Sequence, residues 1–202
     1  MEKKKQSIVL SYTGEGKGKT SAAIGQVLRM LGHGGDVAFV QFIKEWKVSE
    51  HKALAKLGQS YNERPEPYDG KDLENGFRGD RLTFYKGGKG FYHAGNDSAK
   101  DVSDDEHKTA AMETFNMALR MATSDEYDLV VCDEINNAVS DGLISVDALR
   151  KIIQERSPKT SLCLTGRGFP PELLELVDIA TEMRKEKHYF DDGFLALEGI
   201  EY

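Results

Sequence analysis

Residues 7–20 read Ser-Ile-Val-Leu-Ser-Tyr-Thr-Gly-Glu-Gly-Lys-Gly-Lys-Thr, a short apolar run that ends in a glycine-rich turn. The run predicts a buried strand, and the apolar spacing of residues 20–31 predicts a helix directly after the turn. Such a turn directs backbone N–H groups toward an anion, and the helix N-terminus adds partial positive charge. We therefore expect the phosphates of ATP to be held by Thr13, Gly14, Glu15, Gly16, Lys17, Gly18, Lys19, Thr20 and Ser21.

Two side chains of this loop have separate expected tasks. Lys19 is placed to reach outer phosphate oxygens, and the Thr20 hydroxyl is placed to ligate Mg²⁺. The common P-loop spacing would put a glycine at position 13, where this chain has Thr13, and the glycines stand instead at 14, 16 and 18. A tight turn without a ligand is the alternative, which the position between a strand and a helix disfavours.

The rest of the chain repeats the alternation of strand and helix. Residues 36–43 predict a second strand, whose nearly continuous apolar character suits a parallel sheet buried on both faces. Further helices are predicted at 49–57, 101–122, 146–154 and 171–176, and further strands at 82–85, 128–132, 160–164 and 178–183. This pattern predicts an α/β fold of the P-loop NTPase (RecA-like) type, an open, mostly parallel sheet with helices on both faces. We expect one domain over residues 1–202, with a variable excursion and a glycine-rich aromatic loop in residues 60–100.

Composition narrows the function. A net charge of -7 without a basic stripe disfavours nucleic acid as the main partner. No apolar leader or membrane-length apolar run is present, so we expect a cytoplasmic protein that does not bind or span a membrane. The two cysteines, Cys132 and Cys163, lie in apolar runs and are expected to be buried. The five histidines form no ligand spacing and are expected on the surface or in loops.

Two further motifs follow predicted strands. Asp133 and Glu134 end the apolar run 128–132, where a P-loop fold needs a carboxylate for the metal, directly or through water; which of the two contacts the metal stays open. A solvent-facing strand end is the alternative. Arg167 follows the strand at 160–164 and is a candidate phosphate ligand, as is Arg29 on the first helix; surface arginines are the alternative for both. No residue stands out as a general base, which weighs against a plain hydrolase.

These motifs together resemble the P-loop ATP:corrinoid adenosyltransferases. The resemblance is carried by residues 12–25, 29, 32–34, 40–44, 133–136, 142–144, 165–168, 171–173, 178, 181–183, 187–188, 193 and 199–202. It covers nearly the whole chain except residues 45–100, and the family shares the shifted glycine pattern. A family member transfers the 5′-deoxyadenosyl group of ATP to the Co(I) of a corrinoid and releases triphosphate, in adenosylcobalamin biosynthesis or salvage.

The resemblance implies roles and partners for this chain. It implies catalytic roles for Lys19, Thr20 and Glu134, nucleotide contacts for Arg29 and Arg167, and a metal, Mg²⁺ or Mn²⁺, held by Thr20, Asp133 and Glu134. Phe91 matches an aromatic loop that faces the corrin, although His93 stands where the family has tryptophan. A homodimer and a reduced flavoprotein electron donor are also implied. The alternatives are an ATP-binding relative that acts as a sensor, and another P-loop NTPase without corrinoid activity.

Overall fold

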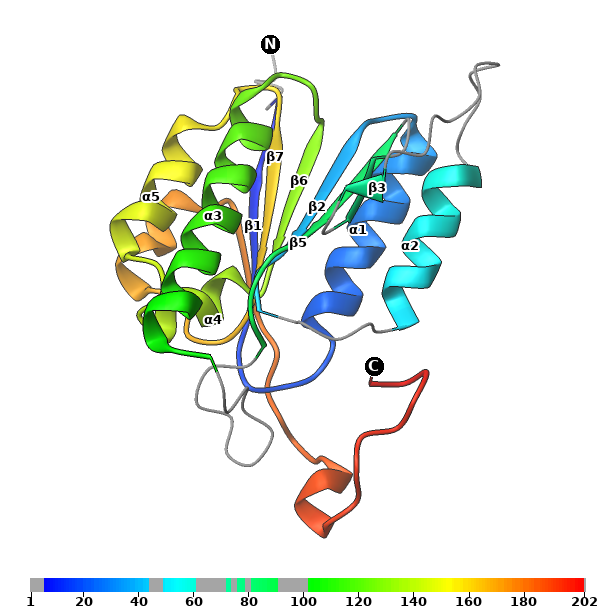
Figure 1. Ribbon diagram of the computed structural model, residues 1–202, viewed down its shortest axis with the longest axis vertical. Coiled ribbons are helices and arrows are strands. Elements are labelled where there is room, and N and C mark those ends of the chain that lie inside the picture. The colour runs from blue at the N-terminus through cyan, green and yellow to red at the C-terminus, as the bar shows by residue number, and fades with distance from the viewer. Residues whose placement is uncertain are drawn as a thin grey trace.

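The computed structural model describes residues 6–43, 49–60, 72–73, 76–78, 81–90 and 102–201 of the chain. One sheet runs through these residues, with helices packed along it (Figure 1). Its strands are β1 (Val9–Thr13), β2 (Val37–Gln41), β3 (Asp72–Leu73), β4 (Gly76–Arg78), β5 (Leu82–Lys86), β6 (Leu129–Asp133), β7 (Ser161–Thr165) and β8 (Ile179–Glu182). The helices are α1 (Lys19–His33), α2 (Ser49–Ser60), α3 (Asp104–Thr123), α4 (Ile135–Ser140) and α5 (Val146–Glu155), with 3₁₀ turns η2 (Pro171–Leu176) and η3 (Tyr189–Asp192).

The strand order is β3-β4-β5-β2-β6-β7-β1-β8. From β5 to β8 every neighbouring pair is parallel, which confirms the predicted α/β fold with an open, mostly parallel sheet. The antiparallel hairpin β3–β4 lies beyond β5, within the predicted excursion. In a parallel sheet the carboxyl ends of the strands gather at one edge, so the turns after β1, β2, β6 and β7 lie close together.

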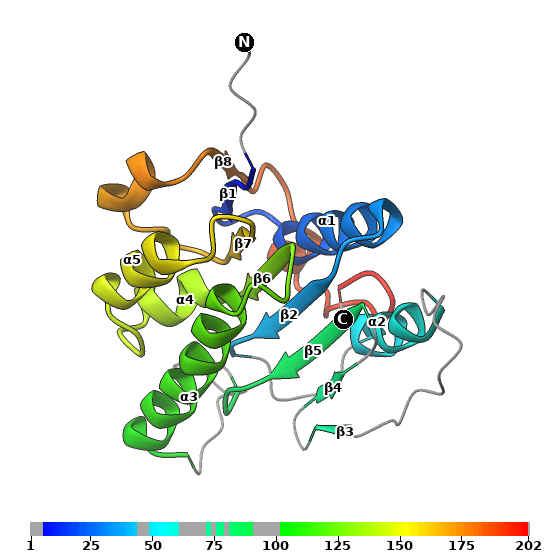
Figure 2. The ribbon, with the colours of Figure 1, turned by 90° about the horizontal axis from the view of Figure 1, so that it is seen from above.

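Both faces of the sheet are covered, as Figure 2 shows from above, with α1 and α2 on one side and α3, α4 and α5 on the other. Strand β2 shows why its sequence is nearly all apolar. Val37 and Phe39 pack into the core under α1, while Ala38 and Val40 pack into the core under α3 and α5. Alternate side chains of one strand therefore enter two different cores.

Local signals in the sequence set several element boundaries. Helix α3 begins at a capping box in which the Ser103 side chain accepts from the Glu106 N–H and the Glu106 carboxylate accepts from the Ser103 N–H. Helix α1 ends at Gly34, which has a φ of 87° and donates to carbonyls of the last turn. Cys132 and Cys163 are free and fully buried in adjacent strands, as predicted.

The structure differs from the predicted elements at α4 and at residues 171–176. Helix α4 was not predicted, because six residues are too few for a periodic pattern. Residues 171–176 form a 3₁₀ turn rather than an α-helix. Strand β8 confirms the predicted last parallel strand, and its four residues are exposed. In the part of the chain that the structure describes, no helix has both the length and the apolarity that a membrane span requires.

Candidate functional site

The turn between β1 and α1 is closed around the side chain of Lys19. Gly14 and Gly18 have φ angles of 103° and 105°, a conformation that other residues rarely adopt. The Lys19 ammonium donates to the carbonyl oxygens of Gly14 at 2.7 Å and Gly16 at 2.8 Å, and the residue is only 8% exposed. Lys19 is therefore held against the turn by two backbone acceptors.

The shifted glycines are explained by the chain that follows β8. The Gly16 N–H donates to the Met183 carbonyl at 2.7 Å, and the Met183 N–H donates to the Thr13 carbonyl at 2.8 Å. A Cβ atom added at Gly14 would lie 2.4 Å from the Met183 oxygen, and one added at Gly16 would lie 2.6 Å from the Arg184 oxygen. Because backbone packs this closely on the loop, positions 14 and 16 have no room for a side chain.

The two carboxylates after β6 lie in different environments. Asp133 is fully buried, whereas Glu134 is half-buried and has a φ of 63°. A positive φ is uncommon for a residue with a side chain and costs on the order of 1–3 kcal/mol. This backbone turns the chain from β6 directly into α4. The Glu134 carboxylate is also the charged group that acts most strongly on Lys19.

Asp133 is held by side chains from both neighbouring strands. Its Oδ2 accepts from the Gln41 amide at 2.9 Å, and its Oδ1 accepts from the Thr165 hydroxyl at 2.7 Å. The Thr165 hydroxyl in turn accepts from the Glu134 N–H at 2.9 Å. Sequence reasoning assigned no role to Gln41 or Thr165. The signal in the sequence was a polar residue inside, or at the end of, an otherwise apolar strand.

The turn after β7 brings Arg167 to the loop. Its guanidinium pairs with the Glu15 carboxylate at 3.1 Å, and its backbone N–H donates to the Asn137 side-chain oxygen at 2.6 Å. Both charged side chains are exposed, so the pair contributes little stability and can be exchanged for a ligand.

Three other predicted nucleotide-binding residues, Thr20, Ser21 and Arg29, lie at different distances from the loop along α1. Thr20 lies half-buried in the first turn, and Ser21 beside it is exposed. Arg29 is exposed and ten residues beyond Lys19 on the same helix, about 15 Å further along its axis. The fold of one chain therefore does not bring Arg29 to the loop.

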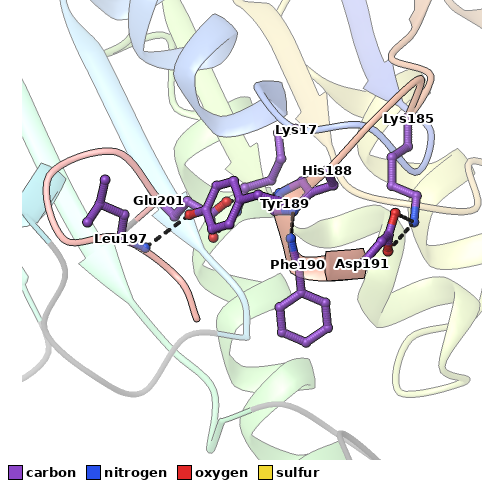
Figure 3. A network of polar contacts seen from close by, with 8 residues as sticks. All are labelled: Lys17, Lys185, His188, Tyr189, Phe190, Asp191, Leu197 and Glu201. Atoms are coloured by element: carbon purple, nitrogen blue, oxygen red, sulfur yellow. Dashed lines mark hydrogen bonds and ion pairs between the residues drawn. The ribbon is translucent and has the colours of Figure 1, made fainter. Parts of the chain in front are cut away.

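The C-terminal segment, residues 183–201, folds back against the same loop (Figures 1 and 3). The Glu201 carboxylate lies 2.9 Å from the His188 ring and 3.6 Å from the Lys17 ammonium, and only 8% of its side chain is exposed. Within the segment, Lys185 pairs with Asp191 at 2.9 Å. Large apolar side chains of the segment stay exposed: Phe190, Phe194, Leu195, Leu197 and Ile200. Polar contacts, rather than apolar burial, therefore hold this segment in place.

The electrostatics of the loop centre on Lys19. Burial lowers the pKa of its ammonium below 10.5, and the neighbouring Arg167 and Lys17 lower it further, while Glu134 and Glu15 act in the opposite direction. Each cation at the loop is accompanied by a carboxylate, because Glu15 pairs with Arg167, Glu201 lies near Lys17 and Glu134 acts on Lys19.

The oxygen donors beside the loop suit Mg²⁺. Within the described ranges, no group of three or more His, Cys, Asp or Glu side chains is placed to hold a metal ion. Mg²⁺ bound with a nucleotide commonly needs only one or two carboxylates besides phosphate oxygens. The Thr20 hydroxyl and the carboxylates of Asp133 and Glu134, all at the carboxyl edge of the sheet, are donors of this kind.

The expectation for the histidines was wrong for His107, which is buried in α3. His188 lies in a loop, as expected, and contacts Glu201, while the half-buried His51 contacts Gln41. Phe91 and His93 lie outside the described residues.

The family model described as ATP:corrinoid adenosyltransferase BtuR/CobO/CobP matches residues 5–202. A corrinoid adenosyltransferase of Pseudomonas aeruginosa is 31% identical over 197 residues, which cover 98% of this chain and 84% of that protein. A corrinoid adenosyltransferase of Escherichia coli K12 is 31% identical over 199 residues, or 98% and 86% of the two chains. Corrinoid adenosyltransferase CobA of Salmonella typhimurium is 30% identical with the same coverage.

Proposed function

Because the chain belongs to the ATP:corrinoid adenosyltransferase family, we propose that it transfers the 5′-deoxyadenosyl group of ATP to the Co(I) of a corrinoid and releases triphosphate. The observation that carries the proposal for this site is the loop after β1, whose buried Lys19 has two exchangeable carbonyl acceptors. The carboxylates after β6 and Arg167 after β7 are brought to the same edge of the sheet.

The reaction needs little acid–base chemistry from the protein. The electron pair of Co(I) forms a bond to C5′ of the ribose, the C5′–oxygen bond breaks, and its electrons leave on the triphosphate. Cobalt is formally oxidised from Co(I) to Co(III). The leaving group therefore gains charge, and the most useful contribution of the protein is to neutralise that charge and to hold C5′ in line with cobalt.

The residues around the loop suit this task. Lys19 exchanges the Gly14 and Gly16 carbonyls for phosphate oxygens, and the N–H groups at the start of α1 face the same anion. Arg167 exchanges Glu15 for a phosphate, which also moves a carboxylate away from the anion. Thr13, Gly14, Gly16, Lys17, Gly18 and Ser21 complete the proposed loop contacts. Arg29 is left out, because it lies about two to three helical turns away.

Thr20, Asp133 and Glu134 would hold Mg²⁺ or Mn²⁺, which would supply charge neutralisation to the triphosphate when bound. Asp133 accepts hydrogen bonds on both oxygens, so its remaining lone pairs suit a bond to a metal-bound water. Glu134 is less buried and acts on Lys19, which suits a place closer to the phosphates.

Several parts of the proposal rest on the family alone. Phe91 is proposed to face the corrin, and a reduced flavoprotein is proposed to supply the electron that makes Co(I). We also propose a cytoplasmic homodimer, for which the exposed apolar side chains of the C-terminal segment offer a surface. Sedimentation velocity would test the dimer directly.

An anaerobic assay tests the function. The purified protein is mixed with ATP, Mg²⁺ and chemically reduced cob(I)alamin, and the visible spectrum and released triphosphate are followed. We expect adenosylcobalamin and triphosphate in equal amounts, and no product with Lys19→Ala. ATP binding without product would contradict the proposal and favour a nucleotide-binding relative. Steady phosphate release without corrinoid would favour another NTPase.

A further inference from the structure

An unbroken chain of hydrogen bonds leads from the buried carboxylate of Asp133 to helix α2. The Gln41 amide nitrogen donates to Asp133 Oδ2 at 2.9 Å, and the Gln41 amide oxygen lies 2.7 Å from His51 Nε2. Asp133 and Gln41 are both fully buried, while His51 is half-buried on the first turn of α2. This series of hydrogen bonds therefore crosses from β6 through β2 to a helix on the face of the sheet.

The directions of these hydrogen bonds are fixed by the carboxylate. An ionised Asp133 only accepts, so Gln41 has to present its NH₂ group to it. The Gln41 oxygen then has to face His51, and His51 Nε2 has to carry a proton. If the imidazole were replaced by an apolar group, the Gln41 oxygen would become a buried acceptor without this donor, which is unfavourable. The amide would then gain reason to rotate and present its oxygen elsewhere.

The ring of His51 is itself held in place. It packs on Phe84 of β5 with the ring centroids 4.9 Å apart and an interplanar angle of 52°. Phe84 stacks in turn on Phe39 of β2. The donor is therefore positioned by aromatic packing on β5 and β2, and β2 is also the strand that carries Gln41.

We propose that His51 is a positioning residue that acts through Gln41 to orient the Asp133 carboxylate for the metal–nucleotide complex. The inference rests on the metal role given to Asp133 in the proposed function. Outer partners of metal ligands typically change metal affinity or activity by about 10- to 100-fold. Since His51 is two hydrogen bonds from the Asp133 carboxylate rather than its direct partner, the lower end of that range applies.

The test uses the full chain and measures ATP binding by calorimetry, once with Mg²⁺ and once with a chelator. We expect His51→Phe to weaken binding of Mg·ATP by about tenfold and to leave metal-free ATP binding unchanged. His51→Gln retains an N–H donor and should recover most of the loss. His33→Phe removes an exposed imidazole at the end of α1 and serves as the matched control.

A double variant separates this role from simple packing. In a Gln41→Leu background, His51→Phe should weaken Mg·ATP binding no further, because the Gln41 amide that connects His51 to Asp133 is already absent. Equal Mg·ATP affinity in the wild type and His51→Phe, even with a lower melting temperature, would overturn the proposal. So would an equal loss of metal-free ATP binding. If the protein showed the tenfold effect but no adenosyl transfer, the proposed function would be contradicted while the positioning role of His51 would still hold.

Discussion

The close packing of the C-terminal segment on the phosphate loop predicts a large effect of one methyl group. In Gly16→Ala the new Cβ would lie 2.6 Å from the Arg184 oxygen and 2.8 Å from the Met183 oxygen. Both neighbours are backbone and cannot rotate away. Forcing extra volume into such a contact costs about 1–3 kcal/mol. Separating the chains would also weaken the 2.7 Å hydrogen bond from the Gly16 N–H to Met183, at about 0.5–1.5 kcal/mol.

Together these contributions predict a loss of about 1.5–4.5 kcal/mol in the free energy of unfolding. For a chain of this size, each kcal/mol lowers the melting temperature by about 2–4 °C. Gly16→Ala should therefore melt roughly 3–18 °C below the wild type in a thermal scan. ATP affinity should fall as well, because the added methyl group forces the backbone of the loop or of the C-terminal segment to move.

Gly25→Ala is the matched control, since a Cβ at this interior position of α1 meets nothing within 4 Å. Alanine is favoured over glycine inside a helix by about 0.5–1 kcal/mol, so this variant should melt slightly above the wild type. If Gly16→Ala matched the wild type or Gly25→Ala in stability and in ATP affinity, the packing explanation of the shifted glycines would be refuted.

Three further predictions concern the charged groups of the site. Lys19→Ala should weaken ATP binding by about 10- to 100-fold, as expected for loss of a charged hydrogen-bond donor; calorimetry showing less than about a threefold change would contradict its role. Asp133→Asn should lower the free energy of unfolding by about 1–3 kcal/mol in a denaturant titration, because its NH₂ group would face the donor of Gln41 or Thr165. Glu134→Gln should alter the Mg²⁺ dependence of ATP binding with little loss of stability. Burial lowers the pKa of Lys19 below 10.5, so the empty site loses this proton as the pH rises toward that lowered value, and bound triphosphate restores it. ATP binding at alkaline pH should therefore take up protons, seen as binding heats that depend on buffer ionisation enthalpy, and Lys19→Ala should abolish the uptake.

The sequence predicted the parts of the site that follow from local chemistry. Glycines between an apolar strand and an amphipathic helix predicted the turn between β1 and α1, and the apolar run before Asp133 and Glu134 predicted the strand that ends at these carboxylates. Phosphate binding by the turn and metal binding by the carboxylates stay predictions. The parallel order of the sheet followed from the alternation of apolar strands with helices.

The remaining features depend on contacts between distant residues. Glu134, the N-cap residue of helix α4, has a left-handed backbone, and no glycine stands at this position to indicate it in the sequence. The role of Gln41 follows from which strands lie next to β2, and that order is not written in the strand itself. Glu201 meets Lys17 because the C-terminal segment returns to the loop through polar contacts, which leave no hydrophobic period in the sequence.

The reaction of the two buried thiols can be used to measure how often the sheet opens. Cys132 and Cys163 lie in the adjacent central strands β6 and β7, and burial raises the pKa of both thiols, so reagents that attack thiolates find no target in the closed protein. Labelling then has to wait for a fluctuation that exposes these strands. Any compound that binds the closed form at concentration [L] makes such exposures rarer by the factor 1 + [L]/Kd. The rate at which a chromogenic thiol reagent is consumed thus reports how often the strands open. Comparing this rate with different nucleotides and metals ranks them by how strongly each stabilises the closed form.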